Sequence, residues 1–392
     1  MLALAALPLF ASVGASIDFG RAASARAGLQ GAVDAAALMM AKDAKVADTT
    51  QLASTANNYL NANFQNSEVT NLESSVTTSS TSSGYSVNMA ASGIVATRFM
   101  GVMGFSKLNV SVHSTALSYR DGLGCVLALD SHASGAGTGQ GSTNVVLNGC
   151  SLYDNSDNTT ALTVGGSAQI TALSVGVVGN LTGAANITTT QGIRTGIGPL
   201  DDPYANASFP AFSGCTDQNF AAKNPVTINP GVYCGGMKLN AGAVVTLTPG
   251  IYYLDGGDLT VNGGATLYGD GVTLVFTSKN RNGYATASIN GNATIDLKPP
   301  KSGGTAGIVI FGDRSMPTGT SFTFNGGATQ YLGGAIYLPK GAVSFSGGAN
   351  SSTSCTQLIG NTVTFTGNSN FALNCNNYGT KPFSPLVVKL TM

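Results

Sequence analysis

The sequence predicts an α+β chain in which a long N-terminal helix leads into a small α+β domain and then into a larger β-rich region. Two features predict this order. An apolar run over Met1–Ile17 continues as an Ala-rich stretch that ends near Ala47. From Cys125 onward, short β-rich runs alternate with recurring Gly- and Asn-containing turns. We therefore expect three domains, over residues 1–47, 48–120 and 121–392.

The apolar run is expected to be a membrane anchor. A spanning helix needs about 20 apolar residues, and the run Met1–Ile17 ends at Asp18. The basic flank that commonly orients such a span is missing, because no Lys or Arg precedes Arg21. We interpret this as a true start upstream of Met1. The alternative is a cleaved signal peptide with its cleavage site at 13–15, although a signal peptide also begins with basic residues.

Two helices are predicted in the segment that follows the anchor. Residues 18–47 are rich in Ala, Leu, Met and Gln, which have high helix propensity. Asp18 and Arg21 form a pair of opposite charge at i,i+3 spacing within it. Asp48 is a suitable N-cap for a second helix over residues 50–64. The apolar residues of that second segment share one helix face: Leu52, Ala56, Tyr59, Leu60 and Phe64.

A small sheet is predicted from the next segment. Val69–Val76 and Tyr85–Ala91 have the composition of strands and are separated by a turn-rich stretch, Thr77–Gly84. Thr97–Met103 predicts a short helical turn. A half-buried strand follows, because apolar and polar residues alternate there; its apolar residues are Leu108, Val110 and Val112.

The N-terminal segment resembles the N-terminal module of TadG-like proteins, which belong to the Tad (tight adherence, Flp) pilus assembly system. The resemblance covers about residues 1–45 and rests on the apolar run, Gly14–Arg21, Leu29-Gln30 and Val33–Ala37. It implies a pilin-like plan in which the helix is both anchor and assembly spine. The partners it implies are other pilus assembly proteins (TadE-like pseudopilins) and the inner membrane. Asp18 and Arg21 are our candidate functional residues at the membrane boundary; the alternative is that they only mark the exit of the helix from lipid.

The third domain is predicted to be a right-handed parallel β-helix or a related β-solenoid. Four-residue turns of the type Asn-Gly-Gly-Ala recur at intervals of 22, 28, 35 and 21 residues, and a period near 20 with insertions is typical of solenoids. Residues 190–224, which contain three prolines, are expected to leave the repeat as a long surface excursion. A β-sandwich is the alternative fold. The recurring turns begin at Asn240, Asn262, Asn290, Asn325 and Ser346.

The cysteines predict disulfides in an oxidising compartment. Six well-separated cysteines without a CxxC pair, in a chain with only two His, fit disulfides better than a zinc site. Free thiols in a cytosolic protein are the alternative. Six cysteines allow 15 connectivities, of which we favour pairing between neighbours: Cys125 with Cys150, Cys215 with Cys234, and Cys355 with Cys375.

Composition argues against several classes of site. The net charge is +0 and 9% of residues are charged, so a nucleic-acid partner is not expected. Asp255 and Asp258 are a close pair of carboxylates that need not converge. Asp130-Ser131-His132 resembles the start of the Asp-x-Ser-x-Ser motif of metal-dependent adhesion domains, but the residue two after Asp130 is His132 instead of Ser. We therefore predict no catalytic residue, no metal site and no cofactor.

The sequence as a whole predicts a non-enzymatic component of a Tad/Flp-type pilus system, anchored in the bacterial inner membrane with its bulk in the periplasm or at the cell surface. It would act in pilus assembly or surface adhesion, and its solenoid would bind a surface glycan or an envelope protein. Two alternatives stay open. One is a secreted ice- or carbohydrate-binding solenoid, suggested by Thr-x-Thr runs such as Thr246–Thr248 and Thr362–Thr366. The other is a polysaccharide-cleaving β-helix that uses Asp255 and Asp258.

Overall fold

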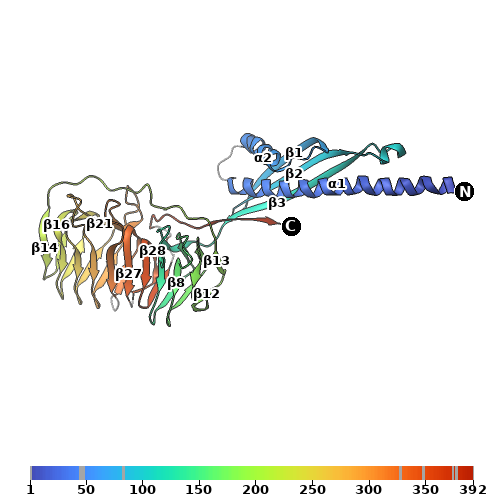
Figure 1. Cartoon of the computed structure of the whole chain (residues 1–392). Coiled ribbons are helices and arrows are strands. Elements are labelled where there is room, and N and C mark those ends of the chain that lie inside the picture. Colours follow the sequence, from blue (N-terminus) through green and yellow to red (C-terminus); the bar gives the residue numbers. More distant parts are fainter. Residues whose placement is uncertain are drawn as a thin grey trace. The chain divides into compact units, whose positions relative to one another are not determined.

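The computed structural model divides the chain into two compact units (Figure 1). Unit 1 consists of Met1–Asp121 and Leu386–Met392, and unit 2 of Gly122–Pro385. The described residues are 2–43, 49–81, 84–325, 329–346, 349–372, 375 and 378–391. For residues 2–11, 43, 49, 50, 81, 329, 349–354 and 372 only the backbone is described.

Unit 1 is built on one long helix, α1 (Leu2–Asp43). Its buried face begins at Ala22 and recurs every three or four residues up to Ala41, the spacing of one face of an α-helix. Most side chains on this face are alanines, so the helix axis can approach the sheet closely. The predicted helix end at Ala47 and the N-cap Asp48 lie outside the described residues. No helix in the described part of the chain is both long and apolar enough to cross a membrane.

An antiparallel sheet packs against α1, together with the helix α2 (Thr49–Asn63). The strand order is β1-β2-β3-β30. The apolar face predicted for the second helix is largely correct, since Leu52, Ala56 and Leu60 are buried and Tyr59 and Phe64 pack against the same core. The strands and the 3-10 turn of unit 1 are β1 (Val69–Thr81), β2 (Gly84–Ala96), η1 (Met100–Met103), β3 (Lys107–Arg120) and β30 (Leu386–Thr391).

The turn predicted over Thr77–Gly84 is too long, because Thr77–Thr81 and Gly84 belong to strands; residues 82–83 lie outside the described residues. The register of β1 with β2 continues from Thr77 opposite Asn88 to Thr81 opposite Gly84. The Ser/Thr run forms strand because Thr is β-branched and suits a pleated surface. The Ser and Thr hydroxyls of the strand face solvent and stay hydrated, so their polarity alone does not indicate a turn here.

In the sequence, unit 2 is inserted between two neighbouring strands of the unit 1 sheet, β3 and β30. β3 ends at Arg120, and the chain returns to pair with it only at Leu386, which lies opposite Arg120 in the antiparallel register. The last strand of the sheet therefore comes from the C-terminal end of the chain. No local sequence pattern predicted this pairing.

The described strands of unit 2 pair in parallel. This contradicts the alternative of a β-sandwich, whose sheets are antiparallel. Unit 2 contains β4 (Gly124–Ala128), β5 (Gly137–Gly139), β6 (Asn144–Asn148), β7 (Ser151–Asp154), β8 (Leu162–Val164), β9 (Gln169–Ala172), β10 (Val175–Val177), β11 (Leu181–Thr182), η2 (Ala184–Asn186), β12 (Ile187–Thr189), β13 (Ile193–Thr195), β14 (Asp217–Ala222), β15 (Val226–Ile228), β16 (Gly231–Leu239), β17 (Val244–Leu247), β18 (Gly250–Asp255), β19 (Leu259–Val261), β20 (Thr266–Gly269), β21 (Val272–Thr277), β22 (Ala287–Ile289), β23 (Thr294–Leu297), β24 (Ile308–Gly312), β25 (Thr320–Asn325), β26 (Thr329–Leu332), β27 (Gly334–Ser346), β28 (Ala349–Phe365) and β29 (Ser369–Ala372).

The order of strands in unit 2 differs from their order in the sequence. One continuous ladder runs β14-β16-β18-β21-β24-β27-β28-β4-β7-β10-β13. The chain enters this stack in the middle, at β4, and builds outward to β13 (Figure 1). It then crosses to the opposite end, begins again at β14 and builds back until β28 pairs with β4. We call the junction between β28 and β4 the seam.

The segment that crosses from β13 to β14 is a strap over residues 196–216. It covers the outer face of the long ladder, where one register column of apolar residues is buried. Phe209 packs edge-on against Phe311, and Phe212 stacks on Tyr253. The predicted surface excursion is therefore a packed cover. The column consists of Val232, Tyr253, Val275, Phe311, Tyr337, Ile359, Leu127 and Tyr153.

The first residues of four of the recurring turns are bonded to one another in pairs. Asn290 donates its side-chain amide to Asn262 Oδ1 at 3.2 Å, and Ser346 Oγ donates to Asn325 Oδ1 at 2.8 Å. Each of these residues ends or follows a strand of the same ladder, β19, β22, β25 or β27. The repeat read from the sequence is thus the repeat of the stacked strands.

Candidate functional site

Asp18 is buried at the junction between α1 and the sheet of unit 1. Its side chain is 1% exposed. Oδ1 accepts a hydrogen bond from the backbone N–H of Arg98 at 2.9 Å, and Oδ2 accepts those of Phe99 and Met100, both at 2.8 Å. These three N–H groups lie at the start of η1, whose N-terminus favours a negative charge. Asp18 therefore ties the helix to the loop that joins β2 and β3.

Arg21 holds the same junction one turn further along α1. Its guanidinium bonds to Glu68 Oε1 at 3.0 and 3.2 Å, to Asp18 Oδ1 at 3.4 Å and to the carbonyl of Ala96 at 3.3 Å. Glu68 immediately precedes β1, and Ala96 ends β2. The predicted pair is thus part of a network that reaches three separate segments of unit 1. Sequence reasoning missed Glu68, although it is one of only two Glu in the chain.

The electrostatics of this network favour the charged forms. Burial by itself raises the pKa of Asp18, but the N–H groups of Met100, Arg98 and Phe99 and the charge of Arg21 outweigh it, so the pKa lies below its ordinary value. The hydrogen bond to Glu68 raises the pKa of Arg21, against the opposing effect of burial. The arrangement is built to fix a carboxylate in place. Both residues of the predicted boundary pair are engaged inside unit 1, and their role at a membrane stays a prediction.

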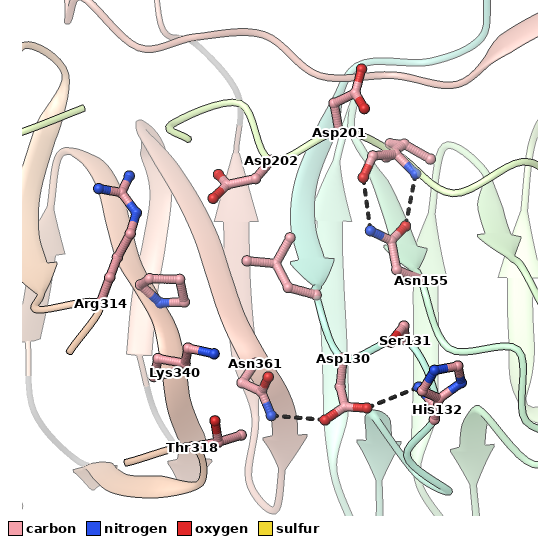
Figure 2. A pocket seen from close by; sticks show the side chains of 13 residues that line it. Asp130, Ser131, His132, Asn155, Asp201, Asp202, Arg314, Thr318, Lys340 and Asn361 are labelled. Atoms are coloured by element: carbon pink, nitrogen blue, oxygen red, sulfur yellow. Dashed lines mark hydrogen bonds between the residues drawn. The ribbon is translucent and has the colours of Figure 1, made fainter. Parts of the chain in front are cut away.

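Unit 2 has a pocket of about 710 Å³ beside the seam (Figure 2). Its lining comes from both halves of the stack and from the strap. Figure 2 shows Asp201 and Asp202 on the strap, across the pocket from Asp130. Asn155 anchors the strap there, because its side chain both donates to and accepts from the backbone of Leu200 at 2.8 Å. Sequence reasoning missed this residue.

Two of the carboxylates that line this pocket, those of Asp130 and Asp202, serve as hydrogen-bond acceptors within the fold. Asp130 takes the N–H groups of His132 and Ala133 and the amide of Asn361 at 2.8–3.0 Å. Burial raises the pKa of Asp130, but these bonds outweigh it and hold the pKa below its ordinary value. Asp202 accepts the hydroxyl of Tyr337 at 2.6 Å.

Arg314 lines the pocket, whereas Asp154 is buried behind it and is not part of its lining. Arg314 also donates to the backbone carbonyls of Tyr204 and Ala207 on the strap. Asp154 is fully buried, and burial raises its pKa to about 6, with a further contribution from Asp130. The pocket therefore offers a polar surface on which Arg314 and Asp202 fix the strap and Asp130 fixes a turn.

The other predicted candidates do not come together. Asp255 accepts the N–H of Lys279 at 2.6 Å, whereas Asp258 accepts the N–H and the hydroxyl of Thr286 at 2.8 Å. Asp255 lines a pocket of about 470 Å³ that does not include Asp258. His132 bonds to Asp157 at 3.0 Å, which raises the pKa of His132. Within the described ranges no group of three or more His, Cys, Asp or Glu is placed to hold a metal ion.

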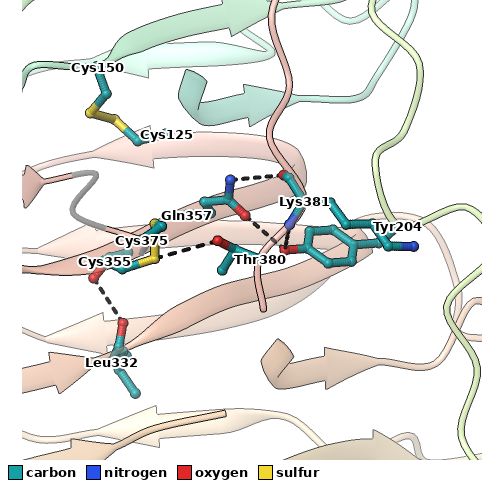
Figure 3. Close-up of a disulfide and its surroundings, with 10 residues drawn as sticks. Cys125, Cys150, Tyr204, Leu332, Cys355, Gln357, Cys375, Thr380 and Lys381 are labelled. Carbon is teal, nitrogen blue, oxygen red and sulfur yellow. Dashed lines mark hydrogen bonds between the residues drawn. A yellow bond between two sulfur atoms is a disulfide. The ribbon is translucent and has the colours of Figure 1, made fainter. Parts of the chain in front are cut away.

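The cysteines form three disulfides, Cys125–Cys150, Cys215–Cys234 and Cys355–Cys375. This is the neighbour pairing that the sequence favours. The first and third lie on the two sides of the seam (Figure 3). Beside the third, the hydroxyl of Tyr204 on the strap donates to Gln357 at 2.8 Å and accepts the N–H of Lys381 at 3.0 Å. The second ties the end of the strap, two residues before the terminal strand β14, to β16. Each disulfide links neighbouring levels of the stack.

Comparison with known proteins gives a match in the N-terminal part of the chain. No curated protein and no solved structure matches the chain. Residues 1–42 match the Tad family model, described as putative Flp pilus-assembly TadE/G-like. The match covers α1, including Asp18 and Arg21. The chain therefore begins with a TadE/G-like module of the Flp pilus-assembly kind.

Proposed function

We propose that this protein is a structural component of a Tad/Flp-type pilus system, anchored in the inner membrane and exposed outside the cytoplasm. The observation that carries the proposal is the TadE/G-like match over residues 1–42. The partners would be other pilus assembly proteins, among them TadE-like pseudopilins. The role would be assembly of the pilus or attachment to a surface.

The difference in burial between the two parts of α1 supports an anchor. From Ala22 to Ala41 one face of the helix is buried against the sheet. Before that point, the apolar side chains of Val13, Ile17 and Phe19 are exposed. The sequence from Leu2 to Ile17 is almost wholly apolar. We infer that this first part of the helix lies in lipid and that the rest forms the core of unit 1.

For unit 2 we propose a parallel β-solenoid that displays a rigid surface. Strands inside the stack pair with strands one level above and below, as in β18, which pairs with β16 and β21. Stacked levels of this kind bury a continuous core that no single level could bury. The disulfides stiffen the last level and both sides of the seam. A stiff module suits adhesion or docking.

We further propose that the protein is not an enzyme. Hydrolysis of a glycan needs two carboxylates placed on opposite sides of the scissile bond. Asp255 and Asp258 accept hydrogen bonds from different turns, and Asp130 and Asp202 hold a turn and the strap. Carboxylates committed in this way are poor candidates for acid–base work.

A glycan-binding role for unit 2 is the second candidate, because one outer register column carries hydroxyls on consecutive levels. The column crosses the seam, where Thr364 lies opposite Thr138. Binding of the full chain on a glycan array, compared with a Thr364→Val variant, tests this role; equal binding by the two would remove it. The column consists of Thr260, Ser288, Thr323, Ser344, Thr364, Thr138, Thr163 and Thr182.

Deletion of the gene tests the proposed function. We expect cells without the protein to lose Flp-type pili or surface attachment, and the full chain to restore them. A variant with Asp130→Asn, Asp255→Asn and Asp258→Asn should restore them equally, because no carboxylate chemistry is involved. Normal piliation and attachment in the deletion strain would contradict the pilus role, and failure of the triple variant with the fold intact would contradict the non-enzymatic role.

A further inference from the structure

The loop between β2 and β3 ends in an exposed apolar tip. We call residues 97–107 the apolar foot. At its tip Val102 is 92% exposed, Phe105 61% and Phe99 49%. Large apolar side chains gathered in one exposed loop commonly mark an interaction site. Nothing in the core of unit 1 requires these side chains to be apolar.

The apolar foot lies against the part of α1 that we propose to be the anchor. A Cβ added to Gly14 would come within 2.6 Å of Phe99 Cβ, so the ring of Phe99 is seated on the bare backbone at Gly14. Gly14 precedes Asp18 by one helical turn, about 6 Å along the axis. The foot therefore reaches past the charged end of the apolar run.

The backbone of the foot is largely paired within unit 1. Asp18 accepts three of its N–H groups. Within the loop, Thr97 N–H donates to Ser106, Val102 to Phe99, Gly104 to Gly101 and Phe105 to Met100, at 3.1–3.2 Å. Paired backbone groups are the condition for placing irregular chain near lipid, because unpaired ones cost several kcal/mol there.

The charges around the foot suit a phospholipid surface. Arg98 and Lys107 flank the apolar residues and are exposed. No Asp or Glu occurs in residues 97–107. Apolar and aromatic residues flanked by basic ones are the composition of segments that lie in the membrane interface.

We propose that the apolar foot inserts into the interfacial region of the bilayer beside the anchor and fixes unit 1 on the membrane surface. The inference rests on the proposed anchoring of α1. If the helix is in lipid up to Ile17, a loop seated at Gly14 enters the same layer. The hydrogen bonds of Asp18 to residues 98–100 then hold the foot against the helix.

A single tryptophan can report on the foot, because the chain contains none. In Val102→Trp the new ring replaces an exposed side chain, so folding is not at stake; Phe105→Trp gives a second reporter at the tip. Tyr85→Trp is the matched control, an exposed position of the same unit at the far end of β2. The full-length variants are reconstituted into vesicles of zwitterionic and anionic phospholipid with brominated acyl chains, and flotation measures binding.

We expect all variants to float with the vesicles. The tryptophan fluorescence of Val102→Trp and Phe105→Trp should move to shorter wavelength and be mostly quenched by bromine. The fluorescence of Tyr85→Trp should show neither change. If the protein floats but the tip tryptophans are quenched no more than Tyr85→Trp, the inference is wrong and the anchor stands. If the protein does not float, anchoring fails and the inference fails with it. A blue shift without quenching would assign the foot to a protein contact and overturn the proposal.

Discussion

Replacing residues 121–385 with Asn-Gly should leave unit 1 folded. Arg120 and Leu386 lie opposite each other in the register of β3 and β30, so the excised chain needs only a two-residue hairpin turn, for which Asn-Gly is well suited. The core of unit 1, formed by α1, α2 and the sheet, contains no residue from the removed segment. We expect far-UV circular dichroism of a helix and a sheet with one cooperative unfolding transition.

The matched control removes far fewer residues and should destabilise unit 1 more. Deletion of Leu386–Met392 takes away β30, its bonds to β3 and the contact of Val388 with the core. Each lost hydrogen bond is worth about 0.5–1.5 kcal/mol net, and β3 becomes an open edge that can aggregate. A truncated protein as stable as the full chain, or an excised protein that does not fold, would contradict the insertion.

Asp18→Ala should be the most damaging single substitution at the helix–sheet junction. Three N–H groups of residues 98–100 would lose their acceptor, and Arg21 would lose one partner. We expect the melting temperature of unit 1 to fall by about 5 °C or more. Asp34→Asn is the control, since Asp34 also lies on α1 but accepts only from Gln30 in the contacts described. Equal melting of the two variants would contradict the role of Asp18.

The effect of Asp18 should depend on pH in one direction. Its pKa is lowered in the folded protein, so the charged form stabilises the fold. That stability is fully present above the unfolded pKa of about 3.9 and is lost as the pH falls through the lowered folded value. The difference in stability between the wild type and Asp18→Ala should therefore narrow only in acid, below about pH 4.

Local features of the structure followed from local sequence signals. The amphipathic face of α2, the strands near Val69, Tyr85 and Leu108, and the turns that begin at Asn240, Asn262 and Asn290 were predictable, because each depends on residue type or periodicity within a short window. Neighbour pairing of the cysteines also follows a short-range rule. The turn predicted at Thr77–Gly84 was placed over too many residues, because a Ser/Thr run has the same composition in a turn and in a solvent-facing strand.

The long-range arrangement had no such signal. At the seam Leu358 lies opposite Val126. Nothing in the sequence of β28 or β4 indicates that they pair with each other instead of only with strands close to them in the sequence. The prolines of residues 190–224 indicated an irregular segment but not that Phe209 and Phe212 cover a second apolar face. Asp18 and Arg21 could be singled out by type. Their partners at residues 98–100 and at Glu68 could not, because those contacts depend on the folded sheet.

The location and redox state of the protein in the cells that produce it test the central claim most directly. The account predicts that the protein stays in the membrane pellet after an alkaline carbonate wash. It also predicts that its six cysteines react with a maleimide-polyethylene glycol only after reduction. Protein in the soluble fraction with thiols that react without reduction would contradict both the anchor and the oxidising compartment.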